Sequence, residues 1–176
     1  MKYILSNDPS LCAWGWCLIN EYGTIKKAGC IKTGSESKKR RVRKGDDRVR
    51  RIQEINLTLL ELFEKFDIKL ILAEQPHGSQ SASSAIMVGI VSGILQTLSD
   101  CKNIPVEYYS EGDVKNYLLN KRSAVKSEMI DKIKELGYGN ALVGIKYIDE
   151  AVADSIGIFL LAKKQSSAIR MILNEK

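Results

Sequence analysis

Residues 3–20 read YILSNDPSLCAWGWCLIN, two apolar segments joined by a short polar turn. The first segment ends at Asp8, and the second alternates in the way that half-buried strands do. We therefore expect strands over residues 3–7 and 13–20, with a turn at Pro9. Asp8 either starts this turn or presents its carboxylate at a strand end, where it could bind a hard divalent cation.

The composition of residues 1–176 is that of one folded domain. Its length allows a buried core, and 44% hydrophobic with 27% charged residues is ordinary for a globular protein. No uninterrupted apolar run reaches the ~18 residues of a membrane span, and the first residues are too polar for a signal peptide. The four cysteines form no C-x-x-C pair and there is one histidine. We therefore expect no zinc site, no membrane partner and a cytoplasmic protein with reduced thiols.

Hydrophobic periodicity predicts the remaining elements. In chain order they are a third strand over 24–33, a basic loop over 34–45, a helix capped by Asp46 or Asp47 that runs to residue 66, a buried strand over 69–74, a small-residue loop over 79–84, an apolar helix over 85–98, a strand over 106–109, a short helix opened by Ser110, a helix capped by Ser123 that ends at Gly137, and a last helix over 149–164. This order predicts an α/β fold, in which helices flank a mixed five-stranded sheet of three antiparallel strands plus two parallel ones.

Positive charge is concentrated in residues 38–51, which hold nine cations and two carboxylates. The segment has a net charge of +7 within a chain of +6, so the other residues sum to about −1. A localised basic block favours a polyanionic partner such as nucleic acid. Alternatively it is a solvated loop that aids solubility, or a nuclear localisation signal. The cations that we assign to DNA binding are Lys38, Lys39, Arg40, Arg41, Arg43 and Lys44.

Two more carboxylates lie in apolar surroundings. Glu74 follows the run Leu70–Ala73, where it could also simply end a strand. Asp154 lies within an apolar helix, and a lone buried carboxylate costs several kcal/mol unless it is paired, protonated or bound to metal. Glu150 lies one turn earlier on the same helix face. No Lys or Arg occurs between Lys146 and Lys163 to neutralise them locally, so we expect a cation there.

Five motifs in order resemble those of the RuvC Holliday-junction resolvases. They are ILSNDPS at residues 4–10, AEQ at 73–75 followed by a small-residue loop and AIMVG at 85–89, Val114-Lys115, SAVKS at 123–127, and VADS at 152–155. Each motif alone is weak, but together they span residues 3 to 164. The resemblance implies a ribonuclease H-like fold, a homodimer, and cleavage of four-way DNA junctions.

The resemblance also implies roles for individual residues. Asp8, Glu74 and Asp154 would hold two Mg²⁺ or Mn²⁺ ions, one activating water and the other stabilising the leaving 3′ oxygen. Lys115 and Lys126 would contact DNA phosphates. We expect Lys126 in the first turn of its helix, where exposed N–H groups already favour an anion.

The chain departs from the RuvC pattern at two positions. The family's fourth ligand lies three residues before the last Asp, where this chain has Ala151. We expect Glu150, rather than Asp149, to replace it, or the site to use three carboxylates. The family often carries an aromatic residue three positions after the central Glu, where this chain has His77. This histidine either stacks on a base or has no role.

The apolar helix over 85–98 carries Gly89 and Gly93 on one stripe, which permits close backbone approach. In the resembled family this helix lies at the dimer interface, but packing on its own sheet is equally compatible with the sequence.

We therefore expect a structure-selective endonuclease in a bacterial or phage-infected cell. The alternatives are an RNA-processing nuclease of the same fold that trims ribosomal RNA precursors, and a catalytically decayed junction-binding protein.

Overall fold

The computed structural model describes residues 1–36, 42–75, 78 and 81–173. Its sheet has the order β3-β2-β1-β4-β5. The strands are β1 (Lys2–Asp8), β2 (Ala13–Asn20), β3 (Ile25–Lys32), β4 (Asp67–Glu74) and β5 (Val106–Tyr109). The first three pair antiparallel, whereas β4 is parallel to both β1 and β5. The expected mixed five-stranded sheet is thus confirmed.

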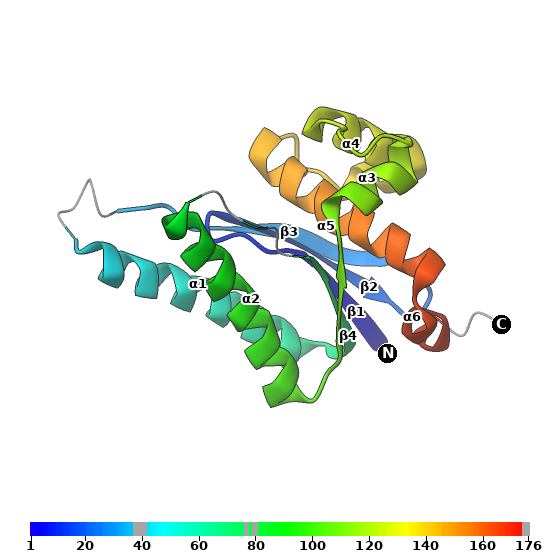
Figure 1. The fold of residues 1–176 in the computed structure, drawn as a ribbon. Helices are drawn as coiled ribbons and strands as arrows, with labels where there is room; N and C mark the ends of the chain where they lie inside the picture. The colour runs from blue at the N-terminus through cyan, green and yellow to red at the C-terminus, as the bar shows by residue number, and fades with distance from the viewer. Residues whose placement is uncertain (37–41, 76–77, 79–80, 174–176) are drawn as a thin grey trace.

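Helices cover both faces of the sheet (Figure 1). They are α1 (Lys44–Lys65), α2 (Ala82–Lys102), α3 (Glu111–Leu119), α4 (Lys126–Ile133), α5 (Lys146–Gln165) and α6 (Ser167–Ile172), with the short turns η1 (Lys134–Tyr138) and η2 (Gly139–Ala141) after α4. One core lies between the sheet and α5 with α3, α4 and α6, and a second lies between the sheet and α1 with α2. Strand alternation divides each strand between these two cores.

Four helix starts differ from the expected ones. Helix α2 begins at Ala82, three residues before the expected start and within the expected small-residue loop over 79–84. Helix α1 begins at Lys44 with Arg43 as its N-cap, so Asp46 and Asp47 lie in its first turn and do not cap it. Helix α4 begins after Val125, not after Ser123, because the Glu128 carboxylate accepts a hydrogen bond from the Val125 N–H at 2.7 Å. Helix α5 begins at Lys146, three residues before the expected start.

Helix α2 is apolar on average, although it contains no uninterrupted apolar run of the length that spans a membrane. By length and composition alone it would qualify as a membrane span, yet only 28% of its most apolar 18-residue window is buried. Glycines and serines interrupt its apolar run without adding charge, which is why counting uninterrupted apolar residues passed over it. Most of this apolar window of α2 is therefore not buried within the described residues.

Candidate active site

Two parallel neighbouring strands each end in a carboxylate. Asp8 is the last residue of β1, and Glu74 is the last residue of β4. The Ser6 hydroxyl donates to the Ser155 carbonyl of α5 at 2.7 Å, so even-numbered positions of β1 face α5. Leu72 of β4 packs in the same core. Because side chains alternate along a strand, Asp8 and Glu74 share this face and this end of the sheet.

Asn7 joins the two strands immediately before Asp8, on the opposite face. Its side-chain amide donates to the Leu72 carbonyl at 3.1 Å, and its Oδ1 accepts the indole N–H of Trp14 at 3.1 Å. Asn7 and Trp14 are both fully buried. These hydrogen bonds fix the C-terminal ends of β1 and β4 side by side, and thus hold the backbone beneath both carboxylates.

Helix α5 reaches the same place because Gly15 has no side chain. Gly15 pairs with Asp8 across β1 and β2. A Cβ at this position would lie 2.0 Å from the carbonyl oxygen of Ala151 in α5 and 2.9 Å from its Cβ. The helix backbone therefore rests directly on the strand next to Asp8. Asp154 follows one turn later on α5 and is 7% exposed.

Burial, followed by repulsion from nearby carboxylates, raises the pKa of all three predicted carboxylates. Burial, followed by the charges of Asp154 and Glu74, raises the pKa of Asp8 well above its ordinary value. Burial, followed by repulsion from Glu111 and Asp154, raises the pKa of Glu74 to about 7. Burial raises the pKa of Asp154 to about 6, although Lys126 opposes the shift. The structure therefore brings Asp8, Glu74 and Asp154 into one electrostatic cluster.

Lys126 is the cation of this cluster. It lies in the first turn of α4, as expected, where it is the first residue, and its ammonium lies 3.6 Å from Asp154 Oδ2. Burial lowers the pKa of Lys126, but the charges of Asp154, Asp8, Glu150 and Glu111 outweigh it and raise the pKa overall. The side chain is half-exposed, so it faces both the carboxylates and solvent.

Glu111 was missed in the sequence. It lies in the first turn of α3, and its charge contributes to the raised pKa of Asp8, Glu74 and Asp154. Its Oε1 forms a 2.5 Å ion pair with Lys115, whose side chain is only 12% exposed. Lys115, expected on a phosphate, thus has a carboxylate partner, and it also helps to lower the pKa of Glu74. The sequence predicts Ser110 as a helix cap, but a cap does not indicate that the charge of the next residue, Glu111, acts on the site.

The two acidic residues before Ala151 have different surroundings. Both oxygens of Asp149 accept backbone hydrogen bonds, from Val143 N at 2.8 Å and Gly144 N at 3.0 Å. Asp149 is therefore buried and holds the loop before α5. Glu150 is half-buried and acts on Lys126 through its charge. Of the two, Glu150 is the one whose carboxylate interacts with the cluster.

The donor set suits a hard divalent cation. Asp154 is buried, Asp8 and Glu74 are partly buried, and a bound cation would relieve both the repulsion among these carboxylates and the cost of their desolvation. Among the described residues, no group of three acidic, histidine or cysteine side chains is close enough to hold an ion as it stands. Ion binding would therefore draw the carboxylates together and compete with the Lys126 ammonium.

Other predicted DNA contacts are only partly described. His77 and the loop residues Lys38, Lys39, Arg40 and Arg41 lie outside the described residues. Arg43 is exposed and pairs with Asp46 at 2.7 Å, and Lys44, the first residue of α1, is exposed.

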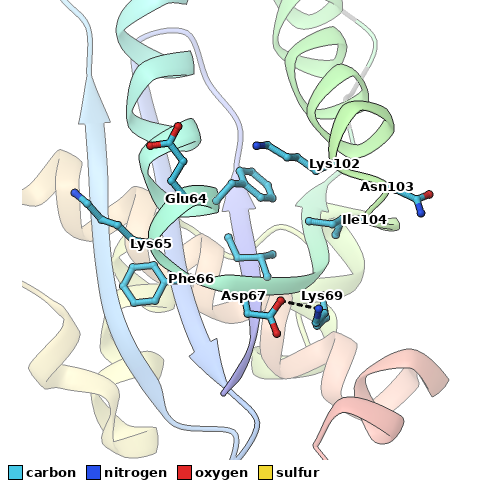
Figure 2. Close-up of a pocket in the computed structure, with 10 residues that line it drawn as sticks. Glu64, Lys65, Phe66, Asp67, Lys69, Lys102, Asn103 and Ile104 are labelled. Atoms are coloured by element: carbon cyan, nitrogen blue, oxygen red, sulfur yellow. Dashed lines mark ion pairs between the residues drawn. The ribbon is translucent and has the colours of Figure 1, made fainter.

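A separate pocket of about 430 Å³ lies at the other end of β4 (Figure 2). It is lined by residues 63–69 and 102–104, and Asp67 pairs there with Lys69 at 2.6 Å. Asp67 is the first residue of β4 and Glu74 the last. Seven residues of strand separate them by about 23 Å, so this pocket is not part of the carboxylate cluster.

Comparison with protein-family models gave no match. Curated relatives do match. The chain is 27% identical over 139 residues to the crossover junction endodeoxyribonuclease RuvC of Photorhabdus laumondii, covering 77% of this chain and 75% of that one. It is 26% identical over 164 residues to RuvC of Rickettsia conorii, covering 92% and 98%.

Solved structures share the fold at low identity. A structure of Thermus thermophilus RuvC in complex with a Holliday junction substrate has a TM-score of 0.68 and 17% identity, over 90% of this chain and 94% of that one. The yeast mitochondrial Holliday junction resolvase Ydc2 has a TM-score of 0.62 and 16% identity, over 97% and 81%. The expected resemblance to the RuvC resolvases and the expected ribonuclease H-like fold are both confirmed: the chain is similar in sequence, over most of its length, to crossover junction endodeoxyribonucleases.

Proposed function

We propose that this protein is a metal-dependent, structure-selective endonuclease that resolves four-way (Holliday) DNA junctions by phosphodiester hydrolysis. One observation carries the proposal: Asp8, Glu74 and Asp154 converge from β1, β4 and α5 beside the Lys126 cation. The relatives of the chain bear the name of this activity. Such an enzyme would act in DNA recombination and repair, in the cytoplasm of a bacterial or phage-infected cell.

Asp8, Glu74 and Asp154, joined by Glu150, would hold Mg²⁺ or Mn²⁺, with two ions as the proposed number. The ions would supply an activated water and stabilise the leaving 3′ oxygen. Lys126 would place its half-exposed ammonium on the scissile phosphate. Lys115 would contact a neighbouring phosphate. If it makes no such contact, its role would be to hold Glu111 in place through their ion pair.

The remaining DNA contacts are proposed for the rim of the site. The basic loop, with Lys38, Lys39, Arg40, Arg41, Arg43 and Lys44, would bind the backbone of the junction arms without reading sequence. His77, which follows Glu74 in the chain, would stack on a base at the exchange point.

A homodimer would place two such sites on one junction, which needs two strand cuts. The face that would pair is that of α2: Ile86 is 51% exposed, and Gly89 and Gly93 have nothing within 4 Å of a Cβ position. Beside Gly93, a largely apolar groove of about 530 Å³ runs between α1 and α2. We expect Ile86→Asp to give a monomer by light scattering. As a control, Met171→Asp on α6, at an apolar residue that is 72% exposed, should leave the dimer intact.

The decisive experiment compares cleavage of matched duplex, flap and four-way DNA substrates, with a ribosomal RNA precursor alongside. We expect the four-way junction to be cut by paired incisions only when Mg²⁺ or Mn²⁺ is present. Asp8→Asn, Glu74→Gln and Asp154→Asn should each abolish cleavage and leave junction binding largely intact, because the basic surface remains. Preferred cleavage of the RNA would instead identify the RNA-processing alternative. Junction binding without cleavage by the wild type would identify the decayed one.

A further inference from the structure

We propose that Tyr147 and Lys32 form a stacking platform for an unpaired DNA base close to the scissile phosphate, on the β3 side of the active site. The inference rests on the proposed nuclease function, and it adds a contact to which the RuvC-like motifs do not point. The Lys32 ammonium lies 4.1 Å from the centre of the Tyr147 ring. Tyr147 is 38% exposed, and Lys32 is exposed.

The register of the sheet sets the distance of this pair from the reacting centre. Asp8 pairs with Gly15, and Gly15 pairs in turn with Cys30, so these residues form one row across three strands. Lys32 lies two residues farther along β3, beyond the end of β1. Strand spacings of about 4.8 Å and a rise of about 3.3 Å per residue place its Cα about 12 Å from that of Asp8.

The distance corresponds to roughly two to four nucleotides of a strand that rises about 3.4 Å per stacked nucleotide. Tyr147 reaches the same place from α5, because it lies one turn before Ala151, whose backbone rests on Gly15. A DNA strand whose phosphate lies at the carboxylates can therefore extend over this pair.

The surroundings of the pair have the chemistry of a single-strand contact. Val143 is 62% exposed and Ile145 47% exposed, and Lys146 is exposed between Ile145 and Tyr147. Single-stranded nucleic acids are bound where aromatic and apolar side chains that stack on bases lie next to cations that contact the backbone. We call these residues, Lys32, Val143, Ile145, Lys146 and Tyr147, the Tyr147 surface.

The Tyr147 surface is held in place before any ligand binds. The Asp149 carboxylate accepts the backbone N–H groups of Val143 and Gly144, so the loop with Val143 is tied to the first turn of α5. The exposed apolar side chains of this surface could also contact a second copy of the chain or another protein. The two lysines and the continuity with the carboxylate cluster favour a nucleic acid, whose backbone is anionic.

The chain contains a matched control. Lys164 lies over the ring of Tyr117 at 5.1 Å, and Tyr117 is 40% exposed. This pair has the same chemistry and a similar exposure. Lys164, however, lies ten residues beyond Asp154 on α5, about 15 Å along the helix. Tyr117→Leu therefore reports what the loss of an exposed, lysine-covered tyrosine does away from the site.

The test uses four-way junctions that carry 5-iododeoxyuridine at single positions around the cleavage point, bound to the full-length protein in chelator, where no cutting occurs. Irradiation should cross-link one position to Tyr147, and mass spectrometry should identify the adduct. Tyr147→Leu should lose this adduct and weaken junction binding about fivefold or more. Tyr147→Phe should retain both, Lys32→Ala should weaken binding less, and Tyr117→Leu should behave as the wild type.

The proposal is overturned if no position cross-links to Tyr147, or if Tyr147→Leu binds the junction as the wild type does. Equal losses in Tyr147→Leu and Tyr117→Leu would also overturn it. Wild-type cleavage of an unmodified junction is measured in parallel with Mg²⁺. If the wild type cleaves the junction but shows no cross-link to Tyr147, the platform alone is refuted. If the wild type does not cleave the junction, the proposed function and the platform are refuted together. Retention of binding in Tyr147→Phe separates stacking from misfolding.

Discussion

Gly15→Ala tests whether the active site is assembled by the contact between α5 and β2. The new Cβ would lie 2.0 Å from the Ala151 carbonyl oxygen and 2.4 Å from its carbon. Ordinary contact needs about 3.5 Å, so the helix and the strand must separate by roughly 1.5 Å. Both clashing atoms belong to the backbone, so no side-chain rotation relieves the clash.

The separation acts where Asp154 must meet Asp8. A displacement of about 1 Å in a catalytic group costs on the order of 100-fold in rate. Overpacking of a core contact costs about 1–3 kcal/mol, which for a domain of this size lowers Tm by about 2 to 12 °C. We therefore expect a folded protein with a modestly lower Tm and a single-turnover rate about 100-fold below that of the wild type.

Two further variants make the reasoning specific. Gly157→Ala on the same helix would bring its Cβ to 2.9 Å from Val114 Cγ1 and 3.0 Å from Met129 Cε. Both atoms belong to side chains and not to the backbone, and the flexible Met129 side chain can move aside, so the rate should stay closer to that of the wild type than in Gly15→Ala. Ala151→Gly should not rescue Gly15→Ala, because the clashing oxygen remains. The argument fails if Gly15→Ala cleaves as fast as the wild type, or if Gly157→Ala is equally impaired.

Further predictions concern the charged residues around the cluster. Asp149→Ala should remove two buried hydrogen bonds to backbone N–H groups and cost about 2 kcal/mol, visible as a Tm lowered by about 4 to 8 °C in thermal melts; an unchanged Tm would contradict the loop-holding role. Lys126→Ala should lower the rate at saturating DNA. Neutralising residues 38–44 should instead weaken binding to all DNAs and flatten its salt dependence by about 0.9 per lost phosphate contact; the reverse pattern would refute this division. Glu150→Gln and Glu111→Gln should be compared by Mn²⁺ titration: the variant with the weaker ion binding identifies the fourth carboxylate, and unchanged binding in both leaves three ligands.

The elements that were predicted most accurately are those whose pattern is local. The bounds of β2 and β5 were predicted to the residue, because alternation and turn residues delimit each strand. Asp8, Glu74 and Asp154 could be proposed as site residues from the sequence because the first two each end an apolar strand and the third lies within an apolar helix. An acidic residue in an apolar segment is costly to bury unless it is paired, protonated or bound to a cation, and the sequence alone shows where such residues lie.

The features that were missed depend on contacts between distant segments. Glu111 has an ordinary position in the first turn of a short helix, and only the packing of α3 against α5, close at Gly157, brings it to the cluster. The cap of α4 was assigned to Ser123 by residue type, whereas Glu128 reaches back to Val125 N and moves the start of the helix. The pair formed by Lys32 and Tyr147 requires both the sheet register and the placement of α5.

Ala151, which replaces the fourth ligand of the resembled family, lies in the contact between α5 and β2 at Gly15. Ala151 stands where the resembled family has its additional ligand, and it is 3% exposed against the backbone of β2. The methyl side chain of Ala151 supplies no ligand at this close approach of α5 to β2. A further negative charge must then come from another direction: from Glu150 on the adjacent face of α5, or from Glu111 on α3. The charge of Glu111 acts on Asp8 and the charge of Glu150 acts on Lys126, so both residues are candidates to complete the site in place of residue 151.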